Sequence, residues 1–210
     1  CAMSQIMKYW NYPPTGIGSY SYNAVGYGTQ TADFGNTNYN YSVMPLSLTR
    51  TSSEEEIFEV AQLMYHCGVS VDMGYGPDGS GAMSDMVPKS WKEYFMFADD
   101  TYMDYMMMHN AERWAIKLKE ELDKSHPLYY SGSNDGGGHA FVCDGYDNNG
   151  LFHFNWGWGG SGDAFFIIDE TFMFPNNQGA IFNAEPKYLN SPTAPSNFEA
   201  TADEDFTKVT

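Results

Sequence analysis

Basic side chains are scarce in this sequence. It has 10 lysines and arginines against 27 aspartates and glutamates, which gives a formal net charge of −17. Nucleic acids and anionic membrane surfaces both require a basic face on a protein partner, so we expect neither as a partner. Long apolar runs are also missing, and no run approaches the roughly 20 residues that a membrane-spanning helix needs. The sequence therefore predicts neither a nucleic-acid-binding protein nor a membrane span.

Cysteine is rare as well. Cys1, Cys67 and Cys143 do not have metal-ligand spacing, which argues against a zinc site, and at least one of the three thiols must be unpaired. An unpaired thiol accompanied by histidine and asparagine is typical of a cysteine nucleophile, although this pattern alone is weakly specific. No signal peptide opens the sequence, but it begins inside an expected helix. We therefore expect a mature or truncated chain, whose start says nothing about export.

Apolar and aromatic residues are abundant. Hydrophobic residues make up 42% of the 210 residues and aromatic residues 17%, which is sufficient for a large buried core. Residues 189–210 differ from the rest, because they are polar and rich in proline, serine and threonine before two short alternating runs. We predict one domain at 1–188, followed by a linker and the first strands of an incomplete fibronectin- or immunoglobulin-like β-sandwich module at 189–210.

Periodicity and capping signals place helices early in the chain and strands late. The expected elements, in order, are a helix at Ala2–Trp10, an aromatic loop with short extended pieces at Pro14–Tyr41, a helix capped by Ser53 and ended by Gly68, a strand at Val69–Met73, a glycine-rich turn at Gly74–Gly81, a helix at Asn110–Lys124, and strands from Leu128 to Phe182. Helices followed by a sheet predict an α+β domain with two halves.

Residues 137–160, GGHAFVCDGYDNNGLFHFNWGWGG, combine structural and chemical signals. The turn sequence Asp147–Gly150 lies between two β-prone runs and predicts a hairpin. Such a hairpin places His139 opposite the segment Asn155–Trp158. An asparagine oxygen can accept from one imidazole nitrogen and leave the other for a thiol, and Trp156 can shield that bond from water. The alternative is a hairpin with a half-buried structural histidine.

The cysteines differ in their suitability as the thiol partner of His139. Cys143 is four residues along the same strand, about 13 Å away, so we expect it in the core. Cys67 lies on the buried face of its helix, where thiols are usually inert. Cys1 lies at a helix amino end, where the helix dipole favours a thiolate, although an exposed, unreactive thiol fits there equally well.

Several segments resemble the streptopain family of bacterial cysteine peptidases, which have a papain-like fold. The resemblance rests on HAFVCDGYDNNGLFHFNWGWGG, on AMSQIMKYWNYP as the first helix, on GVSVDMGYGPDGSGA as the substrate-cleft strand and loop, and on HPLYYSG as the strand before the histidine. It covers most of Ala2–Pro186. It implies a papain-like fold of two lobes, one helical and one an antiparallel β-sheet.

The resemblance also implies roles for individual residues. His139 would be the general base, Asn155 its orienting partner and Trp156 the shield of their hydrogen bond. Gly138 would lie along the substrate backbone. Ser80 or Gly81 would lie near the pocket for the residue that precedes the cleaved one, and this pocket tends to accept apolar side chains.

The amino end departs from the family pattern. The family's nucleophilic cysteine precedes the glutamine of Gln-Ile-Met-Lys by seven residues, whereas Cys1 precedes Gln5 by four. Either the nucleophile lies three residues before Cys1, which we expect, or a three-residue deletion leaves Cys1 in that role. The deletion would move the thiol by about 4.5 Å along the helix, and near-attack geometry is strict.

The sequence thus predicts a secreted bacterial cysteine endopeptidase that cleaves protein or peptide substrates without a metal or organic cofactor. The resemblance further implies an inhibitory amino-terminal prosegment in the precursor. Two other functions stay open: a Cys-His-Asn acyltransferase on the same fold, and a non-catalytic binding module that holds peptide or glycan in the aromatic loop Tyr20–Tyr41.

Overall fold

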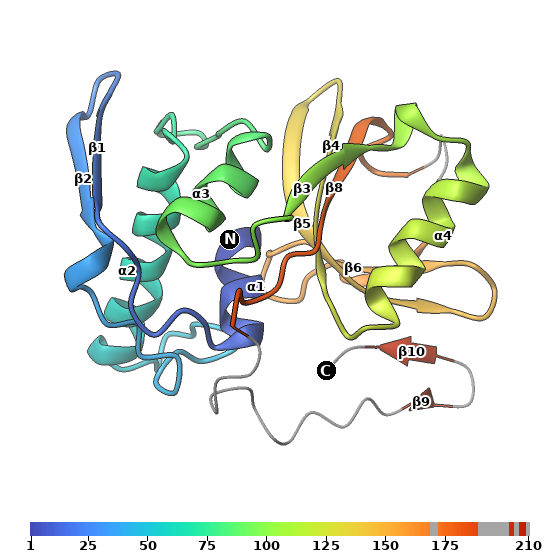
Figure 1. Ribbon diagram of the computed structural model, residues 1–210, viewed down its shortest axis with the longest axis horizontal. Helices are drawn as coiled ribbons and strands as arrows, with labels where there is room; N and C mark the ends of the chain where they lie inside the picture. Colours follow the sequence, from blue (N-terminus) through green and yellow to red (C-terminus); the bar gives the residue numbers. More distant parts are fainter. Residues whose placement is uncertain (169–171, 189–201, 204–205, 209–210) are drawn as a thin grey trace. The chain divides into compact units, whose positions relative to one another are not determined.

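The computed structural model of this chain is a mixed α+β structure (Figure 1). It describes residues 1–168, 172–188, 202–203 and 206–208. The chain divides into two compact units. The helical unit comprises Met3–Asp99 and residues 186–188, and the sheet unit comprises Cys1–Ala2, Asp100–Glu185 and the described residues near the carboxyl end. This composition agrees with the predicted α+β class.

The helical unit contains helices and one small hairpin. Its elements are α1 (Ala2–Trp10, which begins in the other unit), β1 (Ser19–Ala24), β2 (Gly28–Asp33), a short 3-10 helix η1 (Phe34–Asn36), α2 (Glu54–Ser70) and α3 (Met86–Tyr94). Strands β1 and β2 pair in antiparallel fashion. The predicted aromatic loop therefore contains a regular hairpin, whose rows of tyrosine and threonine suit strands.

Helix α2 begins as predicted and ends later than predicted. The Ser53 side chain accepts a hydrogen bond from the Glu56 N–H while the Glu56 side chain accepts from the Ser53 N–H, which is a capping box. The helix continues past Gly68 to Ser70, so the predicted strand at Val69–Met73 was wrong. Val69 is fully buried, and packing outweighs its β propensity.

Helix α3 was not predicted. It contains Pro88, a residue that usually marks a boundary in a sequence. Pro88 is the third residue of the helix, where no intrahelical partner exists for its missing N–H, so the proline is tolerated.

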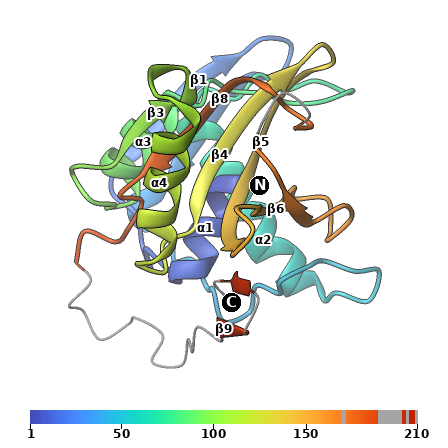
Figure 2. The same cartoon turned by 90° about the vertical axis from the view of Figure 1, so that its right-hand side faces the viewer.

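The sheet unit is built on one antiparallel sheet. Its elements are β3 (Tyr102–Tyr105), a 3-10 helix η2 (Met106–Met108), α4 (Ala111–Leu122), β4 (Leu128–Asn134), β5 (Gly137–Asp147), β6 (Phe152–Asn155), β7 (Ala164–Phe166) and β8 (Asn176–Phe182). The strand order is β3-β8-β4-β5, and β6 pairs with both β5 and β7. Helix α4 packs against β4 and β5, which run side by side (Figures 1 and 2).

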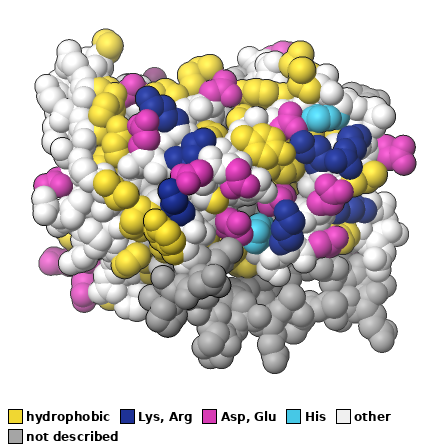
Figure 3. Space-filling model, viewed as in Figure 1, with side chains coloured by type: hydrophobic (Ala, Val, Ile, Leu, Met, Phe, Trp, Pro, Cys, Tyr) yellow, Lys and Arg dark blue, Asp and Glu magenta, His cyan; other side chains and the backbone are white. Residues whose placement is uncertain are grey.

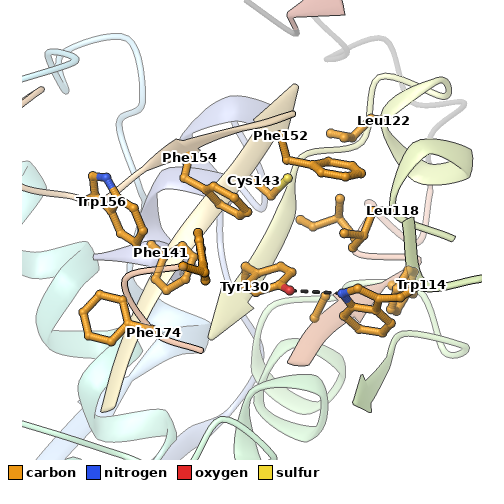
Figure 4. Packing of buried hydrophobic residues seen from close by; sticks show 14 residues of the cluster. Trp114, Leu118, Leu122, Tyr130, Phe141, Cys143, Phe152, Phe154, Trp156 and Phe174 are labelled. Atoms are coloured by element: carbon orange, nitrogen blue, oxygen red, sulfur yellow. Dashed lines mark hydrogen bonds between the residues drawn. The ribbon is translucent and has the colours of Figure 1, made fainter. Parts of the chain in front are cut away.

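The core of the sheet unit is aromatic. Phe141, Phe154 and Trp156 are fully buried and lie in one cluster that also includes residues from α4, β4 and β8 (Figure 4). A polar chain crosses this cluster: the Trp114 indole N–H donates to the Tyr130 hydroxyl at 3.0 Å, and that hydroxyl donates to Gln178 at 2.6 Å. These bonds satisfy buried polar groups and join α4, β4 and β8.

A second polar cluster connects α4 to the end of β8. The Glu121 carboxylate accepts from Lys124 at 2.8 Å, from His126 at 3.3 Å and from the backbone N–H of Asn183 at 3.3 Å. Burial opposes the ionisation of this carboxyl group. The hydrogen bonds from His126 and Lys124 outweigh burial and lower the pKa of Glu121 to about 2.

Surface charge is mixed on the face shown in Figure 3. Lysines and arginines lie among aspartates and glutamates there, and neither sign forms a continuous area on the described part of that face. The sequence predicts no basic surface for nucleic acids or membranes, and this prediction depends on the net charge of −17 for the whole chain.

The predicted linker and module strands at 189–210 lie mostly outside the described residues. The described part consists of β9 (Ala202–Asp203) and β10 (Phe206–Lys208), which pair with each other, while β10 also pairs with β5. A β-sandwich module in this segment stays a prediction.

Candidate functional site

The predicted hairpin is present as β5 and β6. The chain turns between Asp147 and Phe152, and the turn is held by the Asp147 carboxylate, which accepts from the N–H groups of Asn149 at 3.0 Å and Leu151 at 2.7 Å. The register pairs Val142 with Asn155. The hairpin therefore brings His139 and the segment that follows Asn155 to the same open end, as the sequence predicted.

A glycine-rich loop follows Asn155. Gly157, Gly159, Gly160 and Gly162 all have positive φ, which L-residues with side chains rarely adopt. The loop closes at Trp156, whose backbone N–H donates to the Asp163 carboxylate and whose indole N–H donates to the Gly162 carbonyl, both at 2.9 Å. These bonds fix the backbone orientation of Trp156.

Within this loop, Trp156 contacts His139 through its backbone. The Nε2 atom of His139 lies 2.9 Å from the Trp156 carbonyl oxygen. A carbonyl can only accept, so Nε2 must carry the proton in this bond. In the neutral imidazole, Nδ1 is then unprotonated and can accept a proton from a thiol. The contact thus makes Nδ1 the ring nitrogen that can accept a proton.

Asn155 contacts the same loop. Its carboxamide oxygen accepts from the Gly157 N–H at 2.9 Å. The sequence prediction gave this oxygen to a ring nitrogen of His139, whereas the ring nitrogen Nε2 bonds the Trp156 carbonyl. An orienting role for Asn155 stays a prediction.

Aromatic rings surround the imidazole of His139. Trp158 stacks on it with centroids 5.1 Å apart, and Phe174 and Phe141 lie at 5.4 and 5.8 Å. Trp156 is fully buried and stacks on Trp158 at 5.7 Å. The tryptophan whose ring stacks on His139 is thus Trp158, which is 45% exposed, and the Trp156 ring packs against Trp158. The predicted shielding role of Trp156 stays a prediction.

The three cysteines occupy different environments, and none is in a disulfide. Cys143 is fully buried, as predicted, and burial raises its thiol pKa well above the ordinary value. Burial likewise raises the pKa of Cys67 to about 12. A neutral buried thiol is a poor nucleophile. Cys1 is exposed and belongs to the same unit as His139. It lies next to the glycine-rich loop, because a Cβ atom added to Gly157 would be 3.4 Å from the Cβ of Cys1.

The remaining histidines have structural partners. Each is bonded to an acidic or phenolic group: His66 to Tyr39, His109 to Asp104, His126 to Glu121 and Glu185, and His153 to Asp144. His139 instead bonds the carbonyl of a loop residue, Trp156, through its Nε2 atom. This contrast separates it from the structural histidines.

At Gly138 and Gly81, no close contact inside the protein requires a glycine. A Cβ on Gly138 would meet only the Gly132 oxygen, at 3.7 Å, and one on Gly81 would meet no described atom within 4 Å. Neither has a positive φ. Gly81 and Ser80 are exposed residues of a loop in the helical unit that the Gly74–Gly81 bridge closes, with N–O distances of 2.8 and 3.0 Å.

Two other kinds of site are missing from the described residues. They contain no group of three or more histidine, cysteine, aspartate or glutamate side chains arranged to hold a metal ion. In the same part of the chain, no helix combines the length and the apolar character that crossing a bilayer requires.

A mixed α+β chain with an oriented histidine at the end of a β-hairpin, and with cysteines that are in no disulfide, defines a class of candidate cysteine hydrolases. Comparison with known proteins specifies the class. Residues 1–166 match the peptidase C10 family, and this chain belongs to that family of cysteine-type peptidases. The resemblance to streptopain is confirmed.

Individual relatives support this assignment. Streptopain of Streptococcus pyogenes is 35% identical over 176 residues, which are 80% of this chain and 44% of that protein. The thiol protease/hemagglutinin PrtT of Porphyromonas gingivalis is 36% identical over 171 residues, 80% of this chain and 20% of that protein. The chain therefore spans less than half the length of these curated relatives.

Solved structures agree with the fold. Active wild-type interpain A cysteine protease of Prevotella intermedia superposes with a TM-score of 0.81 and 36% identity, covering 88% of this chain and 81% of that one. A prointerpain A fragment from the same organism gives a TM-score of 0.79 and 35% identity, covering 89% and 62%.

Sequence reasoning missed three contributors to the geometry around His139. These are the Trp156 carbonyl, the Trp158 ring and the Phe174 ring. A backbone carbonyl has no side-chain signal in a sequence. Trp158 was visible in the glycine-rich stretch, but only the loop conformation decides which tryptophan ring meets the imidazole.

Proposed function

We propose that this chain is the catalytic domain of a cysteine endopeptidase, with His139 as its general base and acid. The observation that carries the proposal is the 2.9 Å contact between His139 Nε2 and the Trp156 carbonyl in a chain of the C10 family. This contact holds the imidazole with Nδ1 available to a thiol, which is the proton acceptor that cysteine peptidase chemistry requires.

The reaction follows from that tautomer. Nδ1 of His139 accepts the thiol proton, and the thiolate attacks the carbonyl carbon of the scissile peptide bond. The imidazolium returns the proton to the departing amine as the carbon–nitrogen bond breaks and a thioester remains. Water, with His139 again acting as base, hydrolyses the thioester and restores the thiol. No metal or organic cofactor takes part in these steps.

Asn155 acts on His139 through the loop in this proposal. Its carboxamide oxygen accepts from the Gly157 N–H, directly after the residue whose carbonyl receives Nε2–H. Trp158 covers one face of the imidazole, and the buried Trp156 ring supports Trp158. Stacked aromatic rings limit the rotation of the imidazole and exclude water from the Nε2 bond.

The substrates we propose are peptides or proteins. Gly138 would lie along the substrate backbone, and the loop with Ser80 and Gly81 would form the pocket for the residue before the cleaved one, which tends to be apolar. The free space around Gly138 and Gly81 supports this, because a glycine that nothing inside the protein requires fits a position that a ligand backbone approaches.

Two assignments of the nucleophile stay open. One is a cysteine three residues before Cys1, which the register of Gln5 favours. The other is Cys1, which is exposed and lies beside the loop that holds His139. Cys67 and Cys143 are poor candidates because burial keeps both thiols protonated.

We also propose that the parent protein is secreted by a bacterium and is made with an inhibitory prosegment. The support is family membership: the relatives are bacterial proteases, and one of the solved relatives is a fragment of a proform, prointerpain A.

The test is His139→Ala in the full-length protein, with His109→Ala as the matched control. His109 is bonded to Asp104 in the same unit but away from the hairpin. We expect His139→Ala to lower kcat/KM for peptide hydrolysis by at least about 100-fold, with circular dichroism unchanged, and His109→Ala to keep the parent activity. Activity of His139→Ala within about tenfold of the parent contradicts the assignment. Hydrolysis without an added amine separates a peptidase from an acyltransferase.

A further inference from the structure

The small hairpin of the helical unit contacts the segment that leads into the Gly74–Gly81 loop. Tyr20 and Tyr22 are two residues apart on β1, so both side chains lie on one face of the hairpin. The Tyr20 hydroxyl donates to the Asp72 carboxylate at 2.9 Å, and the Tyr22 hydroxyl donates to the Met73 carbonyl at 2.5 Å. Two consecutive residues before the loop are therefore held by the two tyrosines of one face.

The segment that these tyrosines hold has an unusual backbone. Asp72 has φ of 51°, in the left-handed region, two residues after the end of α2 at Ser70. A non-glycine residue in that region is uncommon and requires support from its surroundings. The Met73 N–H donates to the Gly68 carbonyl at 3.0 Å, so the chain turns sharply off the helix before it reaches Gly74. The Tyr20 and Tyr22 hydroxyls bond the two residues that make this turn.

The ring that follows in the loop segment is held as well. Tyr75 packs against Tyr27 of the hairpin with centroids 6.0 Å apart. A Cβ on Gly68 would lie 2.7 Å from the Tyr75 hydroxyl oxygen, so the glycine leaves room for this ring above α2. The loop segment is thus in contact with both ends of the hairpin.

The hairpin itself is anchored to α2. The Tyr65 hydroxyl donates to the Gln30 side chain at 3.3 Å and accepts from the Thr31 N–H at 3.2 Å. Ala24 and Ala32 are buried on the inner face. Burial raises the pKa of Tyr22 to about 12, so its hydroxyl remains a donor at neutral pH. Tyr20 and Tyr22 therefore belong to a hairpin whose position on α2 is held by hydrogen bonds and buried side chains.

From these contacts we infer that Tyr20 and Tyr22 are positioning residues that set the geometry of the Gly74–Gly81 loop and thereby the enzyme's selectivity for the residue before the cleaved one. The inference rests on the proposed function, in which Ser80 and Gly81 of this loop form that pocket. In this inference the tyrosines act through their bonds to Asp72 and Met73 and not as catalytic residues.

The experiment compares Tyr20→Phe, Tyr22→Phe and the double variant with Ser21→Ala in the full-length protein. Phenylalanine keeps the ring and removes only the hydroxyl. Ser21 lies between the two tyrosines on the opposite face and bonds Thr31 at 2.8 Å, so its variant loses a hydroxyl from the same strand without touching the loop.

Two readouts are needed. Hydrogen exchange reports the loop itself: one lost hydrogen bond should lower the protection of amides between residues 72 and 81 about fivefold, and Ser21→Ala should leave it unchanged. Peptide kinetics report selectivity. We expect each tyrosine variant to raise KM about fivefold for substrates with a bulky apolar residue before the cleaved one, with kcat within about twofold.

The outcomes distinguish this inference from the proposed function. Faster loop exchange together with the KM effect supports it. Unchanged exchange, or faster exchange with unchanged KM and selectivity, overturns it while the peptidase assignment stands. If the parent protein cleaves no peptide, the proposed function fails, and the exchange experiment still decides whether the hairpin positions the loop.

Discussion

Two glycines on neighbouring strands offer a sharp test of the substrate path. Gly132 on β4 pairs with His139, and Gly138 on β5 pairs with Ser133. A Cβ on Gly132 would lie 2.5 Å from the Phe174 carbonyl oxygen and 3.0 Å from its Cβ. Backbone atoms at that distance cannot move aside cheaply, and Phe174 packs against the imidazole. Gly132→Ala should therefore strain the core.

Gly138 has no such constraint. Its added Cβ would meet the Gly132 oxygen at 3.7 Å, an ordinary van der Waals contact, and the residue is exposed. Alanine at a compatible backbone position stabilises the folded state by about 0.4–1 kcal/mol, because it reduces the freedom of the unfolded chain. A methyl group at Gly138 would nevertheless occupy the proposed path of the substrate backbone.

The expected results are opposite for the two variants. Gly132→Ala should lower the free energy of unfolding by about 1–3 kcal/mol, the usual effect of overpacking. Gly138→Ala should leave it unchanged or slightly higher and should lower kcat/KM by more than about tenfold, since misplacement of the substrate by about 1 Å has a large effect on rate. Denaturant unfolding and peptide hydrolysis on the same preparations measure both.

Either half of this prediction can fail separately. Gly138→Ala with activity within about twofold of the parent would remove Gly138 from the substrate path. Unchanged stability of Gly132→Ala would refute the steric reasoning about Phe174. Loss of stability in Gly138→Ala would show that the fold itself requires a glycine at this position.

Three further predictions concern charge, thiols and the chain end. The pKa of Glu121 is lowered from 4.5 to about 2. The ionised carboxylate should therefore stabilise the fold by about 2 kcal/mol above about pH 4.5, after allowance for solvent screening, and this contribution should be lost as pH falls towards 2. Glu121→Gln should therefore be less stable than the parent at pH 7 and equally stable near pH 2. The control variant Glu120→Gln, at an exposed residue, should match the stability of the parent at both pH values. A stability difference for Glu121→Gln that does not change with pH would refute the link between the ionisation of Glu121 and the stability of the fold. Iodoacetamide should label Cys1 at equal rates in the parent and in His139→Ala, as expected of a thiol that is not the nucleophile, and slower labelling in His139→Ala would identify Cys1 as the nucleophile. Limited proteolysis should cut within residues 189–197, where the composition is polar and proline-rich, and leave a core ending near Tyr188; resistance of that segment would refute the predicted linker.

Local sequence signals determined much of the fold and part of the site. Helix α1 and the start of α2 were predicted correctly. The start of α2 has a local signal, because its capping box is an interaction between residues three apart. The turn at residues 147–150 was sufficient to predict the β5–β6 hairpin, and the hairpin was sufficient to bring His139 to the segment after Asn155. A tight turn fixes such pairs without information from the rest of the chain.

Helix boundaries and buried faces depended on packing. The chain after Gly68 stays helical to Ser70. Ile57 and Met64, apolar residues at helical spacing from the buried Cys67, are 45% and 38% exposed. Apolar periodicity shows that a helix has a preferred face, but the neighbouring elements decide how wide that face is. The same holds for α3, which was not predicted because Pro88 usually marks the boundary of an element in a sequence. Tertiary contacts favour a helix there.

The tertiary structure alone decided the contacts that orient functional groups. The bond from His139 goes to a backbone carbonyl, whose direction depends on left-handed glycines that a sequence shows only as flexibility. The tyrosines of β1 bond residues more than fifty positions away. Hydrophobic pattern and turn propensity describe neighbours along the chain, whereas these contacts arise only when separate elements pack together and their remaining polar groups find partners.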